Sequence, residues 1–222
     1  FDNESPCYAG DAGVGMIPHV KKLIQEADLI LAINIRFGEM TTDAYTLFEA
    51  PKTKQTLVHA HISDREIGKI YTPDLAAHSG PNHFCKLLST IEIGTEIKKP
   101  WQGWLEAARA GYEQSLDAPA QPSPVDMMSV ISHLRQELPK DAIITNGAGN
   151  FATWPNKFLI FTGQMRLLAP QSGAMGFGVP AAIAAKMAEP DRMVICFAGD
   201  GVFQMNCQEL GTAMQAGAAP II

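Results

Sequence analysis

The sequence predicts an α/β protein with two doubly wound parallel-sheet domains, neither of which we expect to be complete. Short apolar runs typical of buried strands alternate with segments of helical apolar spacing, the pattern of parallel sheets covered by helices. Glycine-rich turns follow two of these runs. The 222 residues are 46% hydrophobic and 18% charged, which fits a globular chain with one large or two small domains.

The first domain is expected at residues 1–95. Two strands are too few for a whole sheet domain, and the chain opens at Phe1 without an initiator Met, so we expect a fragment of a longer protein. Pro18 favours a helix start, because proline suits the first helical turn. The predicted elements are a helix over residues 18–26, a strand over 27–35, a helical stretch over 42–48, a strand over 56–62 and a helix over 81–88.

The second domain is expected at residues 101–222, after a linker at residues 91–100. It alternates between helix and strand throughout its length. Its predicted elements are helices over residues 101–115 and 125–138 with a proline-stiffened loop at 117–124 between them, a strand over 142–145, a glycine-rich loop at 146–150, a helical segment to about residue 161, a strand over 166–168, a helix over 175–187, a strand over 193–198 and a helical segment over 204–217.

Charge and cysteine content exclude several classes of function. The formal net charge is −6 and no basic stripe is present, so we expect neither nucleic acid nor an anionic membrane as a partner. The four cysteines show no C-x-x-C spacing, which favours buried thiols in a reducing compartment such as the cytoplasm. We find neither a signal peptide nor an apolar run long enough to span a membrane.

The most informative feature is Gly199-Asp200-Gly201, which directly follows the predicted strand at residues 193–198. Two glycines let the backbone turn sharply and approach a bound group closely. A carboxylate at the carboxyl end of a parallel strand, beside the start of a helix, suits a hard cation that bridges to a phosphate. Asp-Gly also favours a hairpin, but residues 204–217 have helical rather than alternating spacing.

The residues around this feature resemble a known family. Residues 171–186, 198–205 and 208–214 are similar, in order, to the diphosphate-binding domain of thiamine diphosphate enzymes, in the branch of acetolactate synthase and pyruvate oxidase. Residues 27–37 and 61–67 resemble the central domain of the same enzymes. The resemblance therefore covers nearly the whole chain.

The resemblance implies a metal clamp for the cofactor diphosphate. Asp200 would ligate Mg²⁺, and the backbone amides of Gly199, Gly201 and Val202 would meet phosphate oxygens. Val202 stands where many relatives have a small residue, often Ser or Ala, so a hydroxyl contact is lost there. In relatives an Asn further along the chain is the second ligand; 22 residues follow Asp200 (222 − 200), and none of them is that Asn.

Two further groups of site residues follow from the resemblance. Met175 matches the apolar wedge that bends the cofactor, and the carbonyl of Gly173 would accept a hydrogen bond from the pyrimidine amino group; taken alone, Met175 also fits ordinary core packing. Gly149 and Asn150 lie in a loop after a strand, where amides can bind phosphate, although the loop also fits a plain connection. Asn150 and Phe151 replace the Gln and His of acetolactate synthase-like relatives.

The central-domain residues carry weaker signals. Arg36 resembles an Arg that contacts flavin or adenine nucleotide in some relatives, but Met40 replaces a second Arg, so we do not expect bound FAD. A solvated Arg at a strand end explains Arg36 as well. His59 and His61 share one face of a strand, and without a third nearby ligand we interpret them as core or interface histidines.

The sequence thus predicts part of a thiamine diphosphate- and Mg²⁺-dependent enzyme that acts on a small 2-oxo acid. An acetolactate synthase-like carboligase, a transferase, comes first; a simple 2-oxo acid or oxalyl-CoA-type decarboxylase, a lyase, is the alternative, and a non-catalytic nucleotide-binding module is another. The family places its activating Glu on an N-terminal domain, which has no counterpart here, and forms the site between subunits. We therefore expect a homodimer or homotetramer, and no activity from this chain alone.

Overall fold

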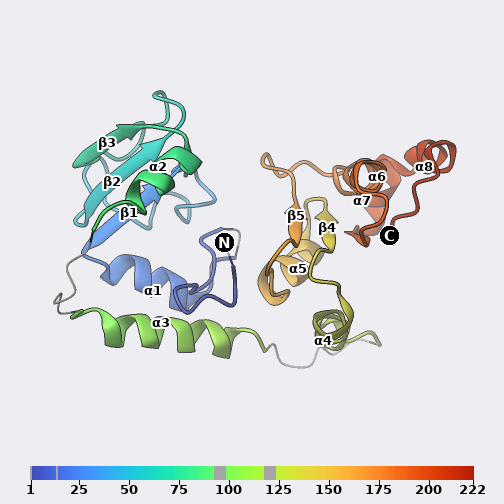
Figure 1. Ribbon diagram of the computed structural model, residues 1–222, viewed down its shortest axis with the longest axis horizontal. Coiled ribbons are helices and arrows are strands. Elements are labelled where there is room, and N and C mark those ends of the chain that lie inside the picture. Colours follow the sequence, from blue (N-terminus) through green and yellow to red (C-terminus); the bar gives the residue numbers. More distant parts are fainter. Residues whose placement is uncertain (1, 14, 93–98, 118–123) are drawn as a thin grey trace. The chain divides into compact units, whose positions relative to one another are not determined.

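The computed structural model describes residues 2–13, 15–92, 99–117 and 124–222 (Figure 1). Contacts divide the chain into two compact units, one formed by Ala9–Tyr112 and the other by Phe1–Tyr8 together with Glu113–Ile222. Most of the predicted linker and of the proline-stiffened loop, residues 93–98 and 118–123, lies outside the described residues. The predicted domain limits, 1–95 and 101–222, stay predictions.

The unit Ala9–Tyr112 contains a small sheet of three parallel strands. The order is β1-β2-β3, with Leu29 opposite Thr56 and Val58 opposite Leu75. The predicted strands and helices of this half are confirmed, apart from one helix. β3 was missed because its residues, Leu-Ala-Ala-His, include none of the β-branched or large aromatic types that favour strands. The elements are α1 (Pro18–Glu26), β1 (Leu29–Ile33), β2 (Thr56–His61), β3 (Leu75–His78), α2 (Pro81–Leu88) and α3 (Gln102–Ser115).

The predicted helix at residues 42–48 is wrong. Asp43, Ala44 and Tyr45 have φ values of 49°, 55° and 62°, in the left-handed region that a right-handed helix does not use. The buried Thr42 side chain stabilises this turn, because its Oγ1 donates to Gly38 O at 2.8 Å and accepts from Tyr45 N at 3.2 Å. Such side-chain bonds compete with helical ones.

The core of this unit lies on one face of the sheet. Ala32, Leu57 and Tyr71 are buried there, and the ring of Phe37 meets Tyr71 edge-on at a centroid distance of 5.5 Å. Side chains alternate between the faces of a strand, so Leu29 points away from this core and is 53% exposed. On the opposite face, Ala60 of β2 is also buried, so that face is covered in part.

The second unit contains another three-stranded parallel sheet, with the order β5-β4-β6. Ile195 of β6 also forms a parallel bridge with Ile221, so residues near the end of the chain run alongside β6. The elements are α4 (Met127–Glu137), β4 (Ile143–Asn146), the 3₁₀ turn η1 (Asn150–Ala152), α5 (Thr153–Phe158), β5 (Arg166–Leu168), α6 (Gly178–Ala188), β6 (Val194–Phe197), α7 (Asp200–Met205), the 3₁₀ turn η2 (Cys207–Glu209) and α8 (Leu210–Ala216).

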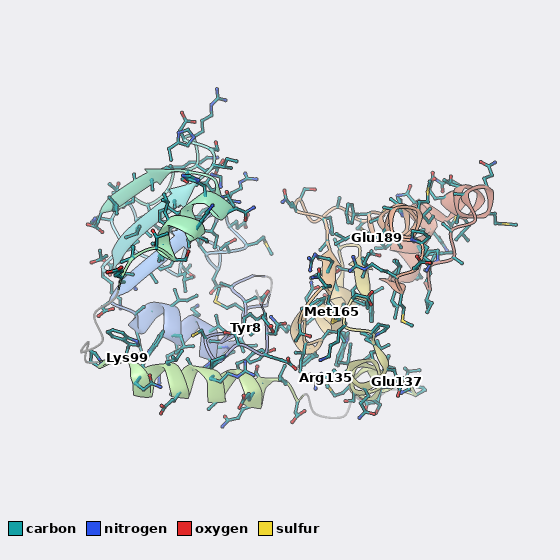
Figure 2. The ribbon with its side chains drawn as sticks, viewed as in Figure 1. Tyr8, Lys99, Arg135, Glu137, Met165 and Glu189 are labelled. Carbon is teal, nitrogen blue, oxygen red and sulfur yellow. The ribbon has the colours of Figure 1, made fainter. Side chains whose placement is uncertain are left out.

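Helices cover both faces of this second sheet, as expected for a doubly wound fold. Ile143 packs in a cluster with Val179 and Ile183 of α6, whereas its neighbour Ile144 packs with Met128 and Ile131 of α4. Arg135 of α4, labelled in Figure 2, donates two hydrogen bonds to main-chain carbonyls of the same unit. Its Nε donates to Phe158 O at 2.6 Å and its Nη2 to Leu116 O at 2.9 Å. The first of these bonds ties α4 to the end of α5.

Two helices begin or end elsewhere than predicted. α6 starts at Gly178 rather than at Met175, so Met175 stands in the preceding turn. The predicted helical segment at residues 204–217 starts earlier, at Asp200, and is interrupted at Asn206, whose φ of −138° and ψ of 26° are not helical. In the part of the chain that the structure describes, we find no helix with the length and apolarity to cross a membrane.

Candidate functional site

Three glycine-rich turns meet at the carboxyl ends of β4 and β6. These strands are adjacent and parallel, so the chain segments that leave them emerge at the same edge of the sheet. A methyl group on Gly147, in the turn after β4, would collide with Val202 Cγ1 and lie 3.7 Å from Gly176 N. The turn after β4, the turn before α6 and the start of α7 are therefore in direct contact.

Gly178 allows the start of α6 to approach the main chain of the turn after β4. A methyl group in its place would lie 2.8 Å from Gly147 N, closer than real side chains pack, and 3.2 Å from Cys196 Sγ, which is a tight contact. The buried Thr145 hydroxyl donates to Gly178 O at 2.9 Å and fixes the same contact from β4. The start of α6 is thus pressed against the turn that leaves β4, as close packing of a strand–turn–helix unit requires.

Asp200 lies where the sequence placed it, directly after β6. Gly199 precedes the helix with φ of −77° and ψ of 165°, and Asp200 is the exposed first residue of α7. A helix follows the turn, so the hairpin alternative is wrong. A hollow of about 450 Å³ beside Asp200 is lined by Ala198, Gly199, Phe203, Leu210, Pro220 and Ile222. The carboxylate thus borders open space rather than the core.

Met175 stands over the start of α7. Its side chain is 49% exposed, and its Cε lies 3.9 Å from the point that a methyl group on Gly201 would occupy. Gly173 and Gly176 flank it with φ values of 67° and 84°, so the chain turns sharply on either side of it. The structure therefore brings Met175 close to Gly201, with Gly173 two residues before it in the same turn, and half exposure does not fit an ordinary core methionine.

Phe151 joins the two turns that leave β4 and β6, a contact that the sequence analysis missed. A methyl group on Gly149 would lie 2.6 Å from its Cε1, and one on Gly199 would lie 3.1 Å from its Cδ1. The ring therefore lies against the backbone of both turns. Asn150, beside it, is exposed at the start of η1. The replacement of a polar residue by Phe, noted in the sequence, was the available signal.

The donors and acceptors at this edge fit a metal-bound diphosphate. Asp200 offers a hard oxygen ligand, and the first turn of α7 offers backbone amides without helical partners. Asn146, at the end of β4, is 2% exposed and donates to Gly147 O at 2.8 Å, while its Oδ1 has no hydrogen-bond partner. Within the described ranges, no three His, Cys, Asp or Glu side chains are close enough to hold a metal by themselves.

In the other unit, His59 and His61 pack together and Arg36 forms an ion pair. His59 is fully buried, meets the ring of His61 at 5.9 Å, and its Nε2 donates to Ile35 O at 3.1 Å. Burial lowers the pKa of His59 from its usual value near 6.5. Arg36 Nε lies 3.5 Å from Glu66 Oε2. These contacts agree with the interpretation of His59 and His61 as core residues.

Comparison with protein families shows which family this chain belongs to. The family model described as "Thiamine pyrophosphate enzyme, C-terminal TPP binding domain" matches residues 147–222, which include all three turns. The model described as "Thiamine pyrophosphate enzyme, central domain" matches residues 1–88. The chain belongs to the thiamine pyrophosphate enzymes and comprises parts of these two domains, as the sequence analysis predicted.

The curated relatives refine this assignment. The chain is 32% identical over 219 residues to the acetolactate synthase large subunit of Cyanidium caldarium, and 34% identical over 202 residues to that of Corynebacterium glutamicum. It is 33% identical over 221 residues to a probable acetolactate synthase large subunit of Methanocaldococcus jannaschii. These matches cover 97%, 87% and 96% of the chain, but 37%, 31% and 36% of the relatives. The chain thus spans about a third of the length of these proteins.

Proposed function

We propose that the intact protein is a thiamine diphosphate- and Mg²⁺-dependent enzyme that acts on a 2-oxo acid, as an acetolactate synthase-like carboligase. The observation that carries the proposal is the meeting of three glycine-rich turns around Asp200 and Met175. A thiamine diphosphate enzyme needs a metal clamp and a bend in its cofactor, and these two residues supply candidates for both within one small region.

Each predicted site residue has a role in this proposal. Asp200 binds Mg²⁺ through its carboxylate, and the amides of Gly199, Gly201 and Val202 meet the diphosphate. The buried Val202 side chain packs on Gly147, so only its backbone is left to contact a ligand. Gly149 and Asn150 would approach the diphosphate from the turn after β4.

Met175 and Gly173 act on the organic part of the cofactor. Met175 supports the bend between its two rings, and the Gly173 carbonyl accepts from the pyrimidine amino group. When bound, the cofactor supplies the electron sink for cleavage of the bond between the keto carbon and the carboxylate of a 2-oxo acid. The protein contributes orientation and exclusion of water around that bond.

Carboligation is preferred over simple decarboxylation because the relatives that match almost the whole chain are named acetolactate synthase. The test is product analysis. Intact protein, thiamine diphosphate, Mg²⁺ and ¹³C-pyruvate should yield labelled acetolactate by NMR. Carbon dioxide with acetaldehyde instead would assign a decarboxylase. No turnover of pyruvate, of other 2-oxo acids or of oxalyl-CoA by a folded, cofactor-loaded protein would contradict the enzyme proposal and favour a binding module.

Further parts of the proposal concern the setting of the enzyme. We propose a homodimer or homotetramer, because the family forms its site between subunits. We also propose a cytoplasmic location, because free thiols are typical of a reducing compartment. The expectation of buried thiols holds for Cys196 but is wrong for Cys7 and Cys85, which are exposed. We do not expect bound FAD, nucleic acid or membrane. The chain by itself is proposed to be inactive, since the activating Glu of the family lies on another domain.

A further inference from the structure

Asn206 links two parts of the candidate site that lie 30 residues apart. It stands between α7 and η2, where its non-helical backbone ends α7 and turns its side chain toward the turn before α6. Its Nδ2 donates to Gly176 O at 2.7 Å. Gln208 Nε2 lies 3.4 Å from Asn206 Oδ1, which favours the orientation of the amide with Nδ2 toward Gly176.

The residue that receives this bond directly follows Met175. Gly176 is buried with a φ of 84°, and a methyl group on it would lie 2.7 Å from Asn206 Nδ2 and 3.2 Å from Met205 Cβ. The turn therefore lies directly on the end of α7. At the other end of the same helix, Met175 reaches Gly201. One short helix thus contacts the turn at both of its ends.

We propose that Asn206 is a positioning residue of the thiamine diphosphate site. The hydrogen bond from its side-chain amide to Gly176 O fixes the position of the turn at Met175 relative to α7. Because α7 begins with Asp200, this bond keeps Asp200 and Met175 at a constant distance from each other. The inference rests on the proposed function and adds to it a residue that touches neither metal nor cofactor in our account. Its effect is transmitted through Met175 and should leave the diphosphate contacts intact.

The test compares Asn206→Ala and the isosteric Asn206→Asp in the intact protein. Asp keeps the shape but removes the donor to Gly176 O. Asn3→Ala is the matched control, since Asn3 Oδ1 accepts from Phe161 N at 2.8 Å in the same unit, outside the three turns. Three quantities are measured: the melting temperature without cofactor, the Kd for thiamine diphosphate with Mg²⁺, and proton–deuteron exchange at C2 of the bound cofactor, which needs no substrate.

Both Asn206 variants should slow C2 exchange about five- to tenfold, the rate equivalent of one hydrogen bond, with the Kd changed less than about twofold. Asn3→Ala should leave the exchange rate unchanged. The double variant Met175→Ala/Asn206→Ala should exchange C2 less than about twofold more slowly than Met175→Ala alone, because both changes act on the same contact.

Three results would overturn the inference. One is that Asn206→Ala slows C2 exchange by the same factor in the wild-type and Met175→Ala backgrounds, which would mean that Asn206 does not act through Met175. Another is that both Asn206 variants have a lowered melting temperature or fail to fold, while the folded fraction of each exchanges C2 at the wild-type rate. The third is a wild-type protein that binds no thiamine diphosphate, a result that overturns the proposed function itself and so is distinct from the first two.

Discussion

At the residue scale, the variant Met175→Ala distinguishes a role of Met175 in cofactor geometry from a role in folding. Truncation of a buried Met to Ala costs about 2–5 kcal/mol of stability. Because Met175 is 49% exposed, Met175→Ala should cost less than about 1 kcal/mol in the protein without cofactor. The same change should lower kcat with cofactor bound, since the support for the bent cofactor is lost.

Thermal unfolding and steady-state kinetics of intact Met175→Ala measure the two effects separately. Val202→Ala is a useful comparison, because Val202 is buried and packs on Gly147. It should lose stability without cofactor, whereas Met175→Ala should not. A large drop in melting temperature together with a normal kcat would make Met175 a core residue.

The burial of His59 leads us to expect a particular dependence of stability on pH. It is fully buried, and its Nδ1 has no hydrogen-bond partner, so protonation there places an unpartnered N–H inside the unit. Burial holds the folded-state pKa below the usual value near 6.5, which leaves the unfolded chain with the higher affinity for the proton. The contribution of His59 is therefore present above pH 6.5 and is lost as the pH falls through its lower folded-state pKa.

Melting temperatures measured between pH 8 and pH 5 check this expectation (the range is about 1.5 pH steps on either side of 6.5). The wild-type value should fall toward pH 5 more steeply than that of His59→Gln. His83→Gln, a change of an exposed histidine on α2, should keep the wild-type slope. Equal slopes for all three proteins would show that His59 does not contribute to acid sensitivity.

Among the candidate site residues, the sequence located Asp200 best. Its flanking glycines and the apolar run before it define a strand, a turn and a helix within a few residues. Asn206 was missed, because its bond to Gly176 joins positions 30 residues apart. Phe151 was noted only as a replacement, since its contacts with Gly149 and Gly199 depend on how β4 and β6 pair.

At the scale of the element, Gly178 and Gly211 form a matched pair. Both are helical glycines of the same unit, but only Gly178 lies against backbone, with Gly147 N at 2.8 Å from a methyl group in its place. Gly178→Ala should therefore destabilise the protein by about 1–3 kcal/mol, because main chain must move. Gly211 has open space around it, and Gly211→Ala should stabilise by about 0.5–1 kcal/mol.

Urea unfolding of the two variants gives this difference directly. Gly178→Ala should also weaken cofactor binding, since it separates the turn after β4 from α6, whereas Gly211→Ala should bind as the wild type does. If both changes stabilise the protein alike, the close approach of α6 to the turn after β4 is not present in solution.

The elements themselves were largely predictable. Apolar runs and proline or glycine at the ends identified α1, β2, β6 and most other elements to within a few residues. The turn at residues 42–48 was not predictable from its spacing, because left-handed φ values and the Thr42 side-chain bonds determine it. β3 was missed since Leu75–His78 contains two alanines and no β-branched residue, a composition that does not favour a strand.

At the scale of the whole molecule, the sequence predicted the family and both domains in order, because the motifs at residues 171–186 and 198–214 are long and collinear. It did not define the acceptor substrate. Residues 147–222 match the cofactor-binding domain, and the turns found there contact the cofactor in our proposal. In the proposed carboligase, the acceptor substrate would be selected by contacts beyond these turns, so product analysis must decide it.

The central claim is that Asp200 binds the Mg²⁺ that holds the cofactor diphosphate. Isothermal titration of the intact protein with thiamine diphosphate, with and without Mg²⁺, tests it most directly, with Asp200→Asn beside the wild type. The wild type should bind tightly only with Mg²⁺, and Asp200→Asn should lose at least about tenfold in affinity, equivalent to about 1.4 kcal/mol. Unchanged affinity and unchanged Mg²⁺ dependence in Asp200→Asn would contradict the claim.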